Sequence, residues 1–183
     1  MRLTRSLFRL ILLILVLVIL ALAILKPEPP VKLPDAEPLR PPLVGQIDRI
    51  VVKKSARQLT VFRDGLALRS YKVALGSAPV GDKVRQGDGK TPEGLFRINR
   101  LNGGSRFHLS LGLDYPQAAD IARAKAGGYD PGGDIMIHGQ PNAFAGRGTL
   151  NYDWTAGCIA LADADIEELW RVTKIGTVVE VRP

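Results

Sequence analysis

An apolar stretch without a single charged residue, from Leu10 to Leu25, separates this chain into parts that need different surroundings. As a helix it would measure about 24 Å, close to the thickness of a bilayer core. Arginines precede it, so we predict that residues 1–25 target the membrane with their N-terminal end in the cytoplasm. Ala21 and Ala23 offer a small-x-small cleavage signal, but the apolar run continues beyond them. This continuation favours an uncleaved anchor over a cleaved signal peptide.

The next segment, residues 26–46, is predicted to be an extended linker. Seven prolines lie between Lys26 and Pro42, and the segment has almost no apolar periodicity. Such a composition favours polyproline II, at about 3.1 Å per residue. Residues 47–183 then have the length of one domain, which at this size buries a core without disulfides.

The charge pattern argues against nucleic-acid binding. The formal net charge is +7, but the first 26 residues contribute four basic side chains and no acid. The basic residues of the remainder are dispersed and do not alternate with aromatic residues, as a nucleic-acid surface would require. We therefore expect no nucleic-acid partner.

Alternating apolar residues predict a mostly β domain with two short helices. Gln58–Arg63 and Leu66–Ala74 are joined by Asp64-Gly65, a strong signal for a two-residue hairpin. The glycine-rich segment 76–94 is predicted to be a long functional loop. The other predicted strands are 47–52, 94–99, 134–139 and 177–181, and the predicted helices are 117–126 and one that begins near Asp163 and ends before Gly176.

Cys158 is the only cysteine of the chain and directly follows a glycine. A lone thiol can be an inert core residue, one metal ligand or a nucleophile. Small residues before Cys158 and apolar residues after it suit a thiol at the mouth of a buried strand, where backbone N–H groups could stabilise an oxyanion. A zinc site would need three or four ligands, and one cysteine with two histidines leaves such a site incomplete.

A nucleophilic cysteine needs a base, and the chain offers two histidines. His138 ends the apolar run that begins at Asp134 and is followed by Gly139, so its side chain is well placed to face a cleft. His108 lies in a mixed stretch without such positional logic. We therefore predict that His138 is the base, the alternative being a core histidine satisfied by the backbone.

These motifs together resemble the L,D-transpeptidase catalytic domain of the YkuD family. His138-Gly139 is followed, at the family's spacing, by Thr155-Ala156-Gly157-Cys158. Upstream, Thr91-Pro92-Glu93-Gly94 resembles the family's Thr-Pro-x-Gly strand entry, and the segment 110–116 resembles another family block. The variant Asp-Trp-Thr-x-Gly-Cys is similar to a YafK-like sub-branch. Two departures stand out: Ala156 replaces the family's second histidine, and Ala160 replaces a polar residue.

The resemblance implies a YkuD-like β-sandwich with two short helices, preceded by the membrane segment. It also implies that the ring of His138 donates a hydrogen bond to the carbonyl of Gly139, and that the backbone N–H groups of Gly157 and Cys158 form the oxyanion hole. Further side chains are candidates for substrate contact: Thr155, Trp154, Tyr152, Arg147 and His108. Arg147, Tyr152 and Trp154 could contact a peptide carboxylate or cover the thioester, the alternative being a solvated loop with one aromatic packed down, and His108 is either pocket lining or surface.

The implied activity is acyl transfer on peptidoglycan stem peptides through a thioester, in cell wall biogenesis and cell shape. An amine acceptor would make the protein a transpeptidase, and water would make it a carboxypeptidase or amidase. A non-catalytic peptidoglycan-binding module is the alternative that the loss of histidine at Ala156 favours. The implied location is the periplasmic, extracytoplasmic face of the cytoplasmic membrane, and neither reaction needs a metal or cofactor.

Overall fold

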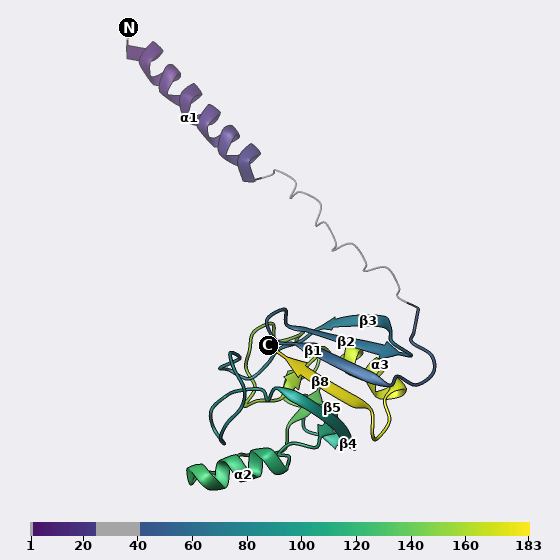
Figure 1. The fold of residues 1–183 in the computed structure, drawn as a ribbon. Helices are drawn as coiled ribbons and strands as arrows, with labels where there is room; N and C mark the ends of the chain where they lie inside the picture. Colours follow the sequence, from purple (N-terminus) through teal and green to yellow (C-terminus); the bar gives the residue numbers. More distant parts are fainter. Residues whose placement is uncertain (1, 25–40) are drawn as a thin grey trace. The chain divides into compact units, whose positions relative to one another are not determined.

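The computed structural model describes residues 2–24 and 41–183, which fall into two units, residues 1–40 and 41–183. The first unit contains helix α1 (Arg2–Ile24), which covers most of the predicted membrane segment (Figure 1). No helix of the described residues combines the length and apolar character needed to cross a membrane. Most of the predicted linker, residues 26–40, lies outside the described residues, so the linker and the anchor stay predictions.

The second unit contains eight strands, which are hydrogen-bonded in the order β3-β2-β1-β8-β4-β5-β6-β7 (Figure 1). Their bounds are β1 Arg49–Lys53, β2 Gln58–Arg63, β3 Leu66–Lys72, β4 Gly94–Ser105, β5 His108–Leu113, β6 Met136–His138, β7 Ile159–Ala160 and β8 Val178–Arg182. The predicted β-rich domain is therefore present. The strands form a continuous order because β4 belongs to both halves: it pairs with β8 over Gly94–Arg97 and with β5 from Ile98 onward.

The β1–β3 half follows the alternation of its sequence. Every second residue of β1 and β2 is buried, including Ile50 and Leu59. Asp64 and Gly65 have φ angles of 50° and 78°, so they form the predicted tight turn between β2 and β3. Strand β3 ends at Lys72, two residues before the predicted end.

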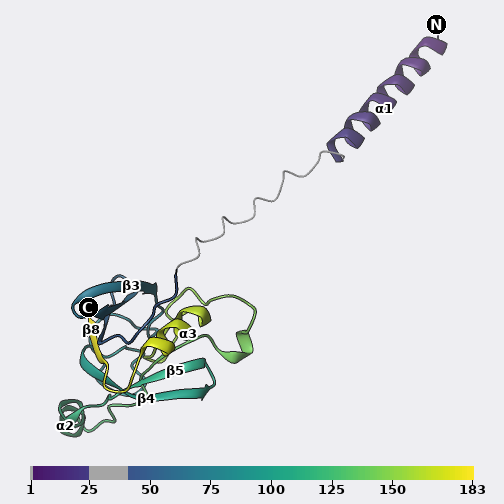
Figure 2. The same cartoon turned by 90° about the vertical axis from the view of Figure 1, so that its right-hand side faces the viewer.

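Two helices of the second unit match the predictions closely. Helix α2 (Ala118–Gly127) ends at Gly128 in the left-handed conformation, as the Gly-Gly pair predicts. Helix α3 (Asp163–Val172) buries Ile166 and Leu169 in the core and lies beside β5 (Figure 2). A 3-10 turn, η1 (Asn142–Phe144), lies in the connection between β6 and β7.

Strand β5 and the second half of β4 were not predicted. Four successive residues of β5, Ser110 to Leu113, are buried, so the strand lacks the alternation that a half-exposed strand shows. The turn signal Asn102-Gly103-Gly104 lies within β4, whereas the chain turns at Arg106-Phe107, next to His108 with its positive φ of 64°. This hairpin forms one wall of the candidate site.

Candidate active site

A pocket of about 330 Å³ opens over the β4–β6 part of the sheet and contains both Cys158 and His138. The remaining lining residues come from the β4–β5 hairpin and from the start of β6. They are Asn102, Gly104, Ser105, Arg106, Phe107, Ser110, Asp134 and Met136. Tertiary structure thus brings the predicted nucleophile and base to one cavity.

Strand register explains why these two side chains meet. Strand β6 pairs with β5 so that His138 lies opposite Ser110, and with β7 so that Ile137 lies beside Ile159. Cys158 precedes Ile159, which places it next to Met136 in the parallel pairing. Met136 and His138 share a face of β6 because side chains alternate along a strand. The thiol and the imidazole therefore project from the same face of the sheet. Along β6 their positions differ by two residues, from Met136 to His138.

His138 is held as a neutral base with one nitrogen free. Its Nδ1 lies 2.7 Å from the carbonyl oxygen of Gly139, which can only accept, so Nδ1 carries the proton and Nε2 is left with its lone pair. Burial lowers the pKa of His138, and the hydrogen bond to Gly139 opposes that shift without reversing it. The hydrogen bond expected from the family resemblance is present in this structure.

Aromatic rings hold the imidazole in place. Phe107 lies 4.6 Å from the ring of His138 between centroids, and Trp154 packs edge-on to it at 5.6 Å. Phe107 and Trp154 also contact each other, at 5.9 Å. Trp154, a predicted substrate contact, packs against the imidazole of His138 in this structure. Its indole N–H is buried and has no hydrogen-bond partner among the described residues.

The thiol of Cys158 is protonated at rest. Burial raises its pKa above the ordinary value, the Asp134 charge adds to the increase, and the Met136 backbone and the Lys83 ammonium oppose it. The sulfur lies 3.5 Å from the carbonyl oxygen of Asp134, to which it donates. Burial thus favours the neutral form of both the thiol and the imidazole.

Thr155 organises the turn before the nucleophile. Its hydroxyl donates to the carbonyl of Cys158 at 2.7 Å and accepts from the N–H of Gly157 at 3.1 Å. The residue is only 5% exposed. Thr155, a predicted substrate contact, therefore uses its hydroxyl inside the turn in this structure. The N–H of Gly157 is likewise engaged by this hydroxyl, so in this structure it is not free for the oxyanion role predicted for it, which stays a prediction together with that of the Cys158 N–H.

Asp153 fixes the start of the same turn, a role that the sequence analysis missed. One carboxylate oxygen accepts from Nε and Nη2 of Arg57, at 3.1 and 2.7 Å, and the other accepts from the N–H of Leu75 at 2.9 Å. Arg57 lies almost a hundred residues away and has a positive φ of 48°. The sequence signals this role only by placing Asp153 directly before Trp154-Thr155. Nothing in the sequence identifies Arg57 as the partner of Asp153.

Glycines allow two close approaches at the site. A Cβ on Gly157 would lie 2.6 Å from the carbonyl oxygen of Lys90, and its φ of 141° also favours glycine. A Cβ on Gly139 would meet the Asp163 carboxylate at 2.6 Å. That carboxylate accepts from the N–H of Gln140 at 2.7 Å. Both glycines of the predicted site are thus required by packing.

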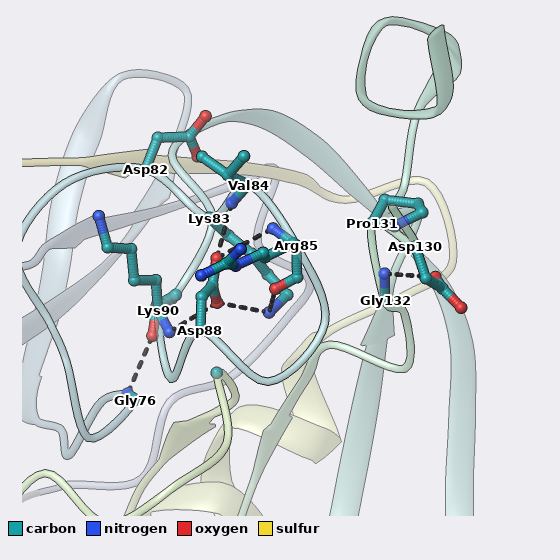
Figure 3. Close-up of polar contacts among 12 residues, drawn as sticks. Gly76, Asp82, Lys83, Val84, Arg85, Asp88, Lys90, Asp130, Pro131 and Gly132 are labelled. Carbon is teal, nitrogen blue, oxygen red and sulfur yellow. Dashed lines mark hydrogen bonds and ion pairs between the residues drawn. The ribbon is translucent and has the colours of Figure 1, made fainter. Parts of the chain in front are cut away.

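The long loop 76–94 packs against the nucleophile turn and is pinned by two buried lysines. Lys54 reaches the carbonyls of Gly81 and Thr91 at 2.7 and 2.9 Å. Lys83 pairs with Asp88 at 2.9 Å, and their side chains are 3% and 11% exposed. Figure 3 shows the Asp88 carboxylate enclosed by Lys83 and by backbone N–H groups of the same loop. The loop that was predicted to be functional is therefore rigidly built where it meets Gly157.

Asp88 remains ionised because of these contacts. Burial alone would raise its pKa, but the hydrogen bond from Lys83 and three backbone N–H donors hold the pKa well below its usual range. The donors belong to Val84, Arg85 and Lys90.

None of the five predicted substrate residues is among the residues that line the pocket. The His108 ring is 2.8 Å from the Glu167 carboxylate of α3. Arg147 and Tyr152 are exposed in the loop between β6 and β7. The hairpin supplies the residues that the sequence analysis missed, among them Arg106 and Ser110. In the part of the chain that the structure describes, no group of three or more histidine, cysteine or acidic side chains is arranged to hold a metal ion.

Residues 47–181 match the family model described as the L,D-transpeptidase catalytic domain, YkuD. The chain belongs to this family. A YkuD domain therefore makes up most of the chain and contains the whole pocket.

Relatives place this YkuD domain more narrowly. YafK of Escherichia coli (strain K12) is 32% identical over 106 residues, which are 57% of this chain and 36% of that protein, and this similarity supports the YafK-like branch. The crystal structure of Pgp2, a helical cell shape determining protein of Campylobacter jejuni, is 28% identical with a TM-score of 0.59. The match covers 75% of this chain and 48% of Pgp2. The structure of Bdellovibrio bacteriovorus Bd1075 shares the fold, with a TM-score of 0.54, 21% identity and coverage of 75% of this chain and 48% of its own. This chain thus spans about a third of YafK and half of Pgp2.

Proposed function

We propose that this protein is a cysteine L,D-transpeptidase that acts on peptidoglycan stem peptides through a thioester. The observation that carries the proposal is that Cys158 and His138 line one pocket while the Nδ1–H of His138 is bound to Gly139. This arrangement leaves Nε2 as the only ring nitrogen that can take a proton from the thiol.

The reaction runs in two halves. In the first, Nε2 of His138 takes the thiol proton, and the Cys158 sulfur attacks the carbonyl that joins an L-centre to a terminal D-amino acid. The resulting oxyanion accepts a hydrogen bond from the Cys158 N–H. The C–N bond then breaks, the departing amine takes the proton from His138, and a thioester remains.

In the second half, an amine of another stem peptide attacks the thioester. His138 takes the proton of that amine and returns it to the departing sulfur, so that an amide forms and the thiol is restored. Water in place of the amine would give a shortened stem and a carboxypeptidase. Neutral resting states of both groups suit this cycle, because neither half starts from a stable ion pair that would have to be broken.

The decisive test is turnover of disaccharide-tetrapeptides by the purified full-length chain, followed by mass spectrometry. Cross-linked dimers that have lost one terminal residue are expected, and Cys158→Ser should give none. Products that appear equally with Cys158→Ser would show that the thiol is not the nucleophile. Shortened monomers alone would assign the protein as a hydrolase.

The proposal includes an extracytoplasmic location, with residues 1–25 as anchor or export signal and 26–46 as linker. It rests on the arginine-flanked apolar run and on the family's cell wall substrate. A reporter that is active only outside the cytoplasm should be active when fused after Pro183. Activity of a cytoplasm-only reporter at that position would refute this location.

A further inference from the structure

Arg57 occupies a backbone position that normally favours glycine. It is the last residue of the turn between β1 and β2, and its φ of 48° lies in the left-handed region, where a side chain costs stability. The same kind of angle at Asp64 belongs to an Asp-Gly turn, but residues 54–57 contain no glycine. An arginine at this position needs contacts that offset the cost of its backbone conformation.

The contacts of Arg57 reach two segments of the chain at the candidate active site. Its guanidinium donates to Asp153 from Nε and Nη2, at 3.1 and 2.7 Å. Its carbonyl oxygen accepts from the N–H of Val73 at 2.9 Å. Asp153 lies just before the loop 155–160, which contains the predicted nucleophile, and Val73 begins the segment 73–77. Arg57 therefore joins these two segments at one end.

Segment 73–77 closes the base of the loop that presents the nucleophile. At the start of the loop, the N–H of Thr155 donates to the carbonyl of Leu75 at 3.1 Å. At its end, Ala74 and Ala160 exchange two backbone hydrogen bonds, at 2.9 and 2.8 Å. Both ends of the loop are thus fixed to one short segment.

Asp153 strengthens this pairing from outside the pocket. Its second carboxylate oxygen accepts from the N–H of Leu75 at 2.9 Å, on the residue whose carbonyl binds Thr155. The side chains of Arg57 and Asp153 are 40% and 17% exposed, so water shields their ion pair only in part. Neither residue lines the pocket. Any effect of the pair on the chemistry therefore passes through the backbone of the loop and not through contact with substrate.

We propose that Arg57 is a positioning residue, which acts through Asp153 to hold the Cys158 thiol beside its base. The inference rests on the proposed function, because it takes Cys158 as nucleophile and His138 as base. Loss of the guanidinium leaves the Asp153 carboxylate with the N–H of Leu75 as its hydrogen-bond donor among the described residues, so the start of the loop gains freedom. A displacement of about 1 Å at a reacting group is enough to lower a rate by up to about 100-fold.

The test uses Arg57→Gly in the full-length protein, because glycine takes the positive φ without strain and removes only the side chain. Relief of the strain offsets the lost ion pair, so the variant should melt within about 5 °C of wild type. Its Cys158 should react with iodoacetamide about 5-fold or more slowly at pH 7, and this deficit should shrink above pH 9.0, where hydroxide replaces the base. Asp64→Gly is the matched control, since it relieves a φ of 50° in another turn and should keep the wild-type rate.

A double variant shows whether Arg57 acts on the alignment of thiol and base. Arg57→Gly/His138→Ala should react no more slowly than His138→Ala alone, because without the base there is no alignment left to lose. Arg57→Lys should recover part of the rate, since lysine keeps the charge without the two-pronged contact, and Asp153→Asn should repeat the deficit. A wild-type rate in Arg57→Gly, or losses that multiply in the double variant, would overturn the inference.

Turnover of disaccharide-tetrapeptides separates this inference from the proposed function. Arg57→Gly should lower kcat about 10-fold and leave KM within about 2-fold of wild type, because the pocket lining keeps its contacts. A raised KM with unchanged kcat would overturn the positioning role. The alkylation deficit of Arg57→Gly does not depend on turnover. If it appears while the wild type turns over no peptide, the proposed function is refuted and the positioning role of Arg57 stands.

Discussion

Replacing Thr155 by valine separates a structural role of this residue from a role in substrate binding. Valine keeps the shape but cannot accept from the N–H of Gly157 or donate to the carbonyl of Cys158. The Thr155 side chain is buried, so these groups lose a partner that water cannot fully replace. Each unsatisfied buried group costs about 1–3 kcal/mol, and with partial relaxation we expect a total loss of about 2–4 kcal/mol.

For a folded unit of this size, each kcal/mol corresponds to about 4 °C in Tm, so Thr155→Val should melt roughly 10 °C below wild type in calorimetry at pH 7. The thiol would also be less well positioned, and kcat should fall by about 10-fold or more. Thr60→Val is the matched control. It removes a 2.8 Å hydrogen bond to Ser70 on an exposed strand face and should change stability by no more than about 0.5 kcal/mol. An unchanged Tm for Thr155→Val, combined with a raised KM alone, would refute the structural reasoning and restore the substrate role.

Two further predictions concern titrating groups. His138→Ala should slow the reaction of Cys158 with iodoacetamide about 10-fold or more at pH 7, and the deficit should shrink above pH 9.0, because burial raises the thiol pKa beyond that value and hydroxide then replaces the base. His108→Ala should leave this pH profile unchanged, and the reverse result would identify His108 as the base. Asp88→Asn should destabilise the domain by about 3 kcal/mol at pH 7, since it leaves the buried Lys83 unpaired. The native pKa of Asp88 lies below its ordinary value of 3.8, so its contribution is present above that pH and is lost as the pH falls. In urea titrations, the difference in free energy of unfolding between wild type and Asp88→Asn should therefore be smaller at pH 3 than at pH 7. An equal difference at both pH values would contradict the ion pair of Asp88 with Lys83 as its cause.

The amino-acid sequence alone determined the features that depend on near neighbours in the chain. Asp64-Gly65 predicted its hairpin because only a few residue types tolerate positive φ at both turn positions. The two short helices followed from apolar periodicity and, for α2, from the glycines at its end; α3 ends at Val172, earlier than Gly176 predicted. A lone cysteine after glycine and a histidine that ends a buried strand predicted the nucleophile and the base, and the two side chains line one pocket.

Tertiary structure decided which groups are available to a substrate. Thr155 and the Gly157 N–H looked available in the sequence but bind each other, while Arg106 and Ser110 line the pocket without any motif that marks them. The physical reason is that hydrogen bonds such as the one from Arg57 to Asp153, 96 residues apart, depend on strand register, which no local pattern encodes. The continuous strand order has the same origin, because a single long strand, β4, pairs with different neighbours along its length and only the folded chain selects them.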